Sequence, residues 1–216
     1  GGAVTQTGGL LEAAVLAVVS DVDVTLRTRV TRVGNVVFSG DALRGGIDES
    51  IDGIRILGAT GVLTLVESDD LILDRVVTAG GDVNLTTVAG GGGGLFLGEL
   101  DATSGDIILQ ADGAIIDDLA GLDTVNLTTS GAANLTAQLG IGASAQGDID
   151  TNLGSLSAVN ALTGNIYIHE RGDLSVTGGG VVTEAGDGNI ALSVVGALTV
   201  EDSAAILNGS FTVKPL

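Results

Sequence analysis

The side chains best able to do chemistry in this sequence are aspartates, which gather where glycine and polar residues indicate turns. Carboxylate and carbonyl oxygens are hard ligands that suit Ca²⁺. The calcium candidates are Asp69, Asp70, Asp117, Asp118, Asp148, Asp150 and Asp187. The tandem glycine-rich repeat of calcium β-rolls is absent, and only the segment G-D-G-N-I at 186–190 hints at it. We therefore favour the interpretation that these aspartates are solvated turn residues. We predict no cofactor and leave calcium binding open.

Paired carboxylates could also act as the acid and base of a glycoside hydrolase. Asp82 and Asp106 hold equivalent places, but each directly follows a glycine that opens a strand, which is typical of turn residues. His169 is the only histidine, and we expect it to be exposed in a turn beside Glu170. The chain has one Tyr and no Trp, so it lacks the aromatic platforms of carbohydrate clefts. We therefore predict no catalytic residues and no enzyme activity.

The elements that must position these side chains are built from small apolar residues. The chain has 216 residues, of which 36 are Gly and one is Pro, and 44% are apolar, nearly all of them Val, Leu, Ile and Ala. This apolar content excludes a disordered chain. Branched aliphatic side chains stacked in regular layers favour β-structure. The absence of Cys excludes a disulfide scaffold and thiolate metal sites.

The charge of the chain excludes two classes of partner. The formal net charge is −19, and Arg171 and Lys214 are the only bases beyond residue 75. Such a surface repels nucleic acid and anionic membranes. The longest apolar run, at 10–19, contains Glu12 and is too short to span a bilayer. We predict neither nucleic-acid binding nor membrane insertion.

One short pattern recurs along the chain. It reads G-N-I-Y-I-H-E-R-G-D-L-S-V at 164–176, and related versions stand at 188–200 and 105–115. Each version holds two short runs of alternating apolar residues, and each run is opened by a glycine. With a mean spacing near 21 residues, the first core residue of the repeat falls at Val83, Ile107, Val125, Ile149, Ile166, Ile190 and Phe211.

This period predicts an all-β, right-handed parallel β-helix of about 21 residues per coil and roughly ten coils. Helical solenoids need strong helix formers and longer periods, and leucine-rich repeats need a fixed leucine frame that is missing. The near absence of Pro fits strands that are hydrogen-bonded on both sides. We interpret 1–216 as a single β-helical segment of a larger protein, with irregular coils over 1–80 and regular coils over 81–216.

The second half of the chain resembles the filamentous haemagglutinin-type exoproteins of bacteria, which are adhesins and related secreted proteins with β-helical shafts. The residues that carry the resemblance are G-D-I-I-L-Q-A-D-G-A-I at 105, L-T-T-S-G-A-A-N-L-T-A at 127, L-G-S-L-S-A-V-N at 153 and the stretch at 164–176. The resemblance implies secretion, a location at the bacterial cell surface and a structural or adhesive role.

The leading hypothesis is a non-enzymatic shaft segment of a large secreted or cell-surface fibre. Its partners would be neighbouring coils of the same or identical chains, stacked end to end through open strand edges. The alternative is a module on the same fold that binds a host glycan or protein through irregular loops near 40–50 and 89–101. A polysaccharide lyase or hydrolase is a third hypothesis, disfavoured by the scarcity of basic and aromatic residues.

Overall fold

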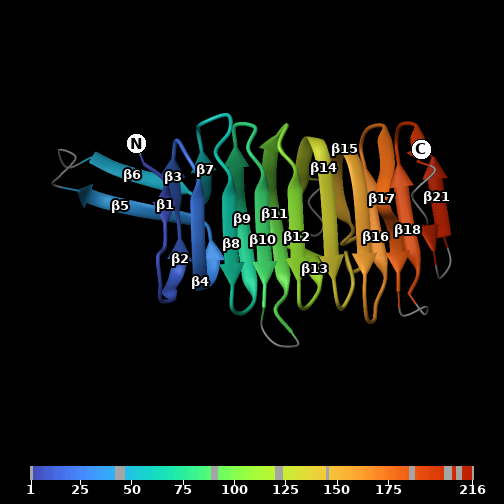
Figure 1. The fold of residues 1–216 in the computed structure, drawn as a ribbon, viewed down its shortest axis with the longest axis horizontal. Coiled ribbons are helices and arrows are strands. Elements are labelled where there is room, and N and C mark those ends of the chain that lie inside the picture. Colours follow the sequence, from blue (N-terminus) through green and yellow to red (C-terminus); the bar gives the residue numbers. More distant parts are fainter. Residues whose placement is uncertain are drawn as a thin grey trace.

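The computed structural model describes residues 2–41, 47–88, 92–119, 124–144, 146–184, 188–201, 206–207 and 211–215. These residues form an all-β parallel solenoid of about 7 turns with a spacing of roughly 24 residues (Figure 1). The prediction of a parallel β-helix is therefore confirmed. No helix long and apolar enough to cross a membrane occurs in the described part of the chain.

Strands alternate with short turns along the whole chain. In the first half they are β1 (Val4–Thr5), β2 (Leu11–Leu16), β3 (Val18–Ser20), β4 (Val24–Val33), β5 (Asn35–Asp41), β6 (Ile47–Asp52), β7 (Ile54–Ile56), β8 (Leu63–Glu67), β9 (Leu71–Thr78), β10 (Val83–Thr87) and β11 (Leu95–Thr103). In the second half they are β12 (Ile107–Ala111), β13 (Ile115–Asp117), β14 (Leu127–Ala137), β15 (Ile149–Asn160), β16 (Ile166–Glu170), β17 (Leu174–Thr183), β18 (Ile190–Val194), β19 (Leu198–Val200), β20 (Ile206–Leu207) and β21 (Phe211–Pro215).

The parallel pairings arrange these strands on three faces. The first face runs from the start of β4 through β8, β10 and β12 to the second halves of β14 and β15. The second face contains β2, the end of β4 and the first parts of β9 and β11, followed by β13. The third face contains β3, β7, the ends of β9 and β11, and the first parts of β14 and β15.

The core is a set of aliphatic columns that run along the solenoid axis. On the first face Leu65, Leu85, Leu109 and Leu135 face one another on successive coils, and all four are buried. Because alternate residues of a strand point to opposite sides, every second residue enters this core. Regular stacking of one residue type replaces the irregular aromatic packing of most globular cores.

The coils are longer and fewer than the sequence predicted. Val83 pairs with Ile107 and Ile107 pairs with Ala133, so these turns take 24 and 26 residues rather than about 21. Val125 and Ile149 are not equivalents of Ile107, although the sequence placed them in line with it. The strands of all three faces share one alternation of apolar and polar residues, and the pattern alone does not tell the faces apart.

An antiparallel hairpin formed by β5 and β6 interrupts the parallel coils within the first 80 residues. These strands pair antiparallel and belong to a separate two-stranded sheet. The hairpin lies between β4 and β7 and projects beyond the first coil (Figure 1). At its base the N–H of Gly53 donates to the carbonyl of Gly34 at 3.1 Å. Gly53 has a φ of 69°, and a Cβ there would lie 1.9 Å from the carbonyl oxygen of Arg75, so only glycine fits.

Candidate functional site

Aspartate and asparagine side chains link successive coils at the points where strands begin. In each case the Oδ1 of the residue directly before a strand accepts a hydrogen bond from the backbone N–H that faces it on the next coil. The seven Asx rungs, 2.7–2.9 Å long, are Asp23 to Val62, Asp70 to Gly94, Asp82 to Asp106, Asp106 to Ala132, Asn126 to Asp150, Asn165 to Asn189 and Asp173 to Ala197. Asp82 and Asp106 thus add a bond between coils to the role of turn residue that the sequence indicated.

A fully buried glutamate closes the corner after β8. The Oε2 of Glu67 accepts hydrogen bonds from the hydroxyl of Thr28 at 2.7 Å and from the N–H of Val30 at 2.8 Å. Its Oε1 accepts from the N–H of Ser68 at 2.7 Å. A carboxylate offers about four acceptor positions, so one side chain satisfies three donors that the corner removes from water.

A second corner, after β16, follows the same plan. The Oε2 of Glu170 accepts from the hydroxyl of Thr151 at 2.8 Å and from the N–H of Leu153 at 3.1 Å. Its Oε1 accepts from the N–H of Gly172 at 2.8 Å. Burial raises the pKa of Glu170, and the hydrogen bonds from Gly172, Thr151 and Leu153 oppose this effect without cancelling it.

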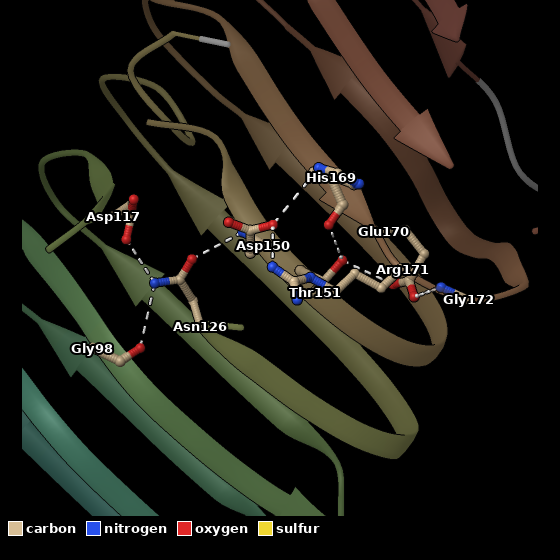
Figure 2. Close-up of polar contacts among 9 residues, drawn as sticks. All are labelled: Gly98, Asp117, Asn126, Asp150, Thr151, His169, Glu170, Arg171 and Gly172. Carbon is tan, nitrogen blue, oxygen red and sulfur yellow. Dashed lines mark hydrogen bonds and ion pairs between the residues drawn. The ribbon is translucent and has the colours of Figure 1, made fainter. Parts of the chain in front are cut away.

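Beside the second corner, polar side chains form a column across four strands, which we call the polar column (Figure 2). Its members are Asp117 at the end of β13, Asn126 before β14, Asp150 in β15, His169 in β16 and Arg171 directly after β16. The pairing of β14 with β15 places Asn126 beside Asp150, and the pairing of β15 with β16 places Asp150 opposite His169. The parallel register therefore builds the column from residues scattered over more than 50 positions of sequence.

Asn126 lies at the centre of the polar column and is fully buried. Its amide nitrogen donates to the Oδ1 of Asp117 at 2.8 Å and to the carbonyl of Leu97 at 3.0 Å. Its Oδ1 accepts from the N–H of Asp150 at 2.9 Å. Both ends of the amide are thus occupied, which is the condition for burying a polar side chain at low cost.

Burial and neighbouring charges shift the pKa of Asp150, a carboxylate of the polar column. Its Oδ1 lies 3.5 Å from Nη2 of Arg171 and 3.7 Å from Nδ1 of His169, an ion-pair distance when the imidazole carries a proton. Burial raises the pKa of Asp150, and the charge of nearby Asp148 acts in the same direction. The charges of Arg171 and His169 lower it, but burial prevails.

A buried carboxyl with a raised pKa beside a histidine has the ingredients of an acid–base pair. The contacts favour a different role. Both oxygens of Glu170 are used by donors from its own corner. The Oδ1 of Asp150 faces the side chains of His169 and Arg171 in the same chain. These contacts hold neighbouring coils together.

The structure separates most of the predicted calcium ligands. Asp69 and Asp70 lie exposed in the turn between β8 and β9, where Asp70 accepts from the N–H of Gly94 at 2.7 Å. Asp118 is exposed after β13. The hydrogen bond from Arg32 to Asp74 raises the pKa of Arg32, burial opposes it, and the charges of Asp74 and Asp118 add to the increase.

The other candidates lie in or near the polar column. Asp117 is buried and bonds to Asn126, Asp150 bonds within the column as above, and Asp148 lies in the turn before β15. Asp187 lies outside the described residues. Within the described ranges, no three His, Cys, Asp or Glu side chains are grouped so that they could hold a metal ion. Calcium binding at these aspartates stays a prediction.

Two features of this region differ from the sequence-based expectation or escaped it. His169 belongs to strand β16 with 26% of its side chain exposed, whereas the sequence placed it in an exposed turn. The strand continues because Glu170, its last residue, is held inside the corner. The sequence did not single out Glu67 and Glu170. A signal existed in Thr-x-Val at 28–30 and Thr-x-Leu at 151–153, each followed one coil later by a glutamate.

Comparisons of the chain with family models, curated proteins and solved structures found no match. A function therefore has to be inferred from the fold and its surface. The relevant features of the molecule are the bonds between coils and the exterior of the three faces.

Proposed function

We propose that this chain is a non-enzymatic structural shaft, a segment of a large secreted or cell-surface bacterial fibre. The observation that carries the proposal is the set of Asx rungs. Backbone ladders already connect the coils, and side chains add further bonds in the same direction at seven positions. A chain selected to hold a long, regular stack needs this reinforcement, whereas a catalytic domain needs it less than it needs a cleft.

The two glutamate corners support the same proposal. Each fastens the end of one coil to the next coil through buried hydrogen bonds, and neither presents its carboxylate to solvent. The net charge of −19 keeps such rods soluble and apart from one another along their sides. Right-handed coiling follows from the rule for parallel crossover connections. The resemblance of the second half to haemagglutinin-type exoproteins supports a bacterial surface location.

Small-angle scattering and surface labelling test the proposal. We expect a pair-distance distribution skewed towards long distances, as for a rod. We also expect antibodies raised against the chain to label intact cells of the strain that produces it. A symmetric distribution, or labelling only after lysis, would contradict the shaft. Release of new reducing ends or unsaturated sugars from a panel of polysaccharides would contradict its non-enzymatic character.

The same fragment tests end-to-end association with identical chains. Sedimentation velocity at increasing concentration should show species that grow in length, because open strand edges pair with further strands. A single monomeric species at all concentrations would limit the partners to coils of the same chain.

A further inference from the structure

The exterior of the third face carries a row of polar side chains, one on each of three successive coils. Asp101 of β11 faces Thr128 of β14, and Thr128 faces Asn152 of β15. Strands in a sheet lie about 4.8 Å apart, so the row presents a carboxylate, a hydroxyl and an amide at a regular interval. The row runs along the axis of the solenoid.

Two adjoining hollows follow this row and share Thr128. The first has a volume of about 230 Å³ and is lined on its polar side by Arg75, Glu99 and Asp101. The second has a volume of about 330 Å³. We call the two together the hydroxyl groove, and its polar lining includes Arg75, Asp101, Thr103, Thr128, Ser130 and Asn152.

The groups in the middle of the hydroxyl groove are available to a ligand. Within the part of the chain that the structure describes, the side chains of Thr128 and Asn152 make no hydrogen bond. Thr103, at the edge of the second hollow, has a φ of 56°, the only positive φ of a non-glycine residue among the described ones. Strained backbone of this kind concentrates at binding sites, where the surroundings hold it in place.

The lining of the groove defines the ligand class. Val77 and Val125 give the first hollow apolar walls beside its charged pair, and the second hollow is rich in hydroxyl groups. A sugar ring has the same combination of an apolar face and a polar edge, and the two valines take the place of the aromatic platforms that this chain lacks. The excess of acids over bases in the chain, 27 against 8, disfavours polyanions. We propose that the hydroxyl groove binds a neutral oligosaccharide that lies along the solenoid axis.

This binding site is independent of the proposed shaft. A rod can be an inert spacer or can hold glycan along its side, and scattering data do not respond to the difference. The site overlaps the end of the stretch 89–101 that the sequence suggested for ligand contacts, but the shared residues 99–101 belong to strand β11 rather than to an irregular loop.

Titration of the isotope-labelled protein with oligosaccharides, followed by ¹H–¹⁵N NMR, tests the proposal. The probes are cellohexaose, mannohexaose and N-acetylchitohexaose at millimolar concentration, with an oligogalacturonate hexamer as the anionic contrast. We expect at least one neutral hexasaccharide to shift amide signals of 99–103, 127–130 and 152–154. Thr128→Val removes one hydroxyl at nearly constant volume and should weaken binding about three- to tenfold, the value of one hydrogen bond.

Thr136→Val provides the matched control. Thr136 is a half-exposed threonine on the outside of the first face, away from the groove, and its loss should leave the affinity unchanged. The proposal is overturned if none of the neutral hexasaccharides shifts these signals, or if the oligogalacturonate binds as well as they do. It is also overturned if Thr128→Val binds as tightly as the control.

Discussion

The corner after β8 and the corner after β16 solve one problem with the same side chains in different surroundings. In both, a threonine hydroxyl and the N–H two residues later donate to one oxygen of a glutamate on the next coil. The first corner is surrounded by exposed groups, with Asp69, Asp70 and Arg29 around a shallow hollow. The second lies beside the buried polar column.

The comparison of the two corners indicates which of their interactions are essential. A sharp bend between parallel strands turns backbone N–H groups inward, where water cannot reach them. A buried carboxylate is the most compact acceptor for several such donors, so both corners use a glutamate although their sequences differ. The polar column is an addition to one corner rather than a requirement of both. Substitutions that compare the corners can test this view.

The largest effect should follow from removing either carboxylate. Glu67→Leu leaves the hydroxyl of Thr28 and the N–H of Val30 without an acceptor, whereas the N–H of Ser68 keeps a carbonyl of the neighbouring coil. Glu170→Leu leaves the N–H groups of Leu153 and Gly172 without an acceptor, whereas the hydroxyl of Thr151 keeps a backbone carbonyl. Unsatisfied buried donors cost about 1–3 kcal/mol each, so two of them should lower the free energy of unfolding by roughly 2–6 kcal/mol. Urea unfolding with a fixed m value measures this loss.

Glu12→Leu is the control for those two variants. Glu12 forms an ion pair with Arg29 at 3.2 Å, but both side chains are more than half exposed, at 63% and 57%. Exposed pairs contribute about 0–1 kcal/mol, so this variant should stay close to the wild type. If only one of the two corner variants loses more stability than the control, the corners are not equivalent.

A smaller effect should follow from removing the threonine hydroxyls. Thr28→Val and Thr151→Val keep the shape of the side chain and remove one hydrogen bond to a carboxylate, which contributes roughly 1.5–3 kcal/mol. We expect a smaller loss of stability for Thr151→Val. The single hydroxyl proton of Thr151 is shared with the carbonyl of His169, 3.2 Å away, which weakens its hydrogen bond to the carboxylate. Double-mutant cycles with Glu67→Gln and Glu170→Gln measure the coupling in each corner. Additive effects would show that the hydroxyl and the carboxylate do not interact.

The sequence predicted the stack but not the corners, for physical reasons. Alternating residues such as Leu63 and Leu65 must face a core, and a glycine-punctuated period must bring like strands together. The face on which a strand lies depends on the lengths of the turns, and these turns vary. The polar column depends on register between segments far apart in sequence, so a residue such as Asn126 gives no local signal.

A third prediction concerns pH and belongs to the second corner. Burial raises the pKa of Glu170 above its unfolded value, so the charged form is disfavoured in the folded state. Its contribution to stability is therefore fully present below the unfolded pKa, near 4.5, and is lost as the pH rises through the folded pKa. Each unit of raised pKa corresponds to about 1.4 kcal/mol.

Unfolding curves of the wild type and Glu170→Gln from pH 4.5 to pH 7.5 isolate this contribution. Glu170→Gln loses a hydrogen bond at every pH, but its side chain cannot be ionised, so this position no longer contributes a pH dependence. We expect the stability difference between the two proteins to shrink as the pH rises. A difference that is constant, or that grows with pH, would contradict a raised pKa at Glu170.

The smallest effect should distinguish the arginines of the two corners. Arg171 pairs with the buried Asp150, whereas Arg29 pairs with the exposed Glu12. Arg171→Met should lower the free energy of unfolding by about 1 kcal/mol at pH 7, because it removes the positive charge that stabilises the buried carboxylate of Asp150. Arg29→Met should lower it by less than about 0.5 kcal/mol. Without Arg171 the pKa of Asp150 rises further, and a protonated carboxyl needs no counter-charge. The cost of Arg171→Met should therefore fall as the pH is lowered towards 4, while that of Arg29→Met stays small throughout. Equal costs at pH 7 would mean that the polar column adds nothing to the second corner, and that the two corners differ only in their neighbours.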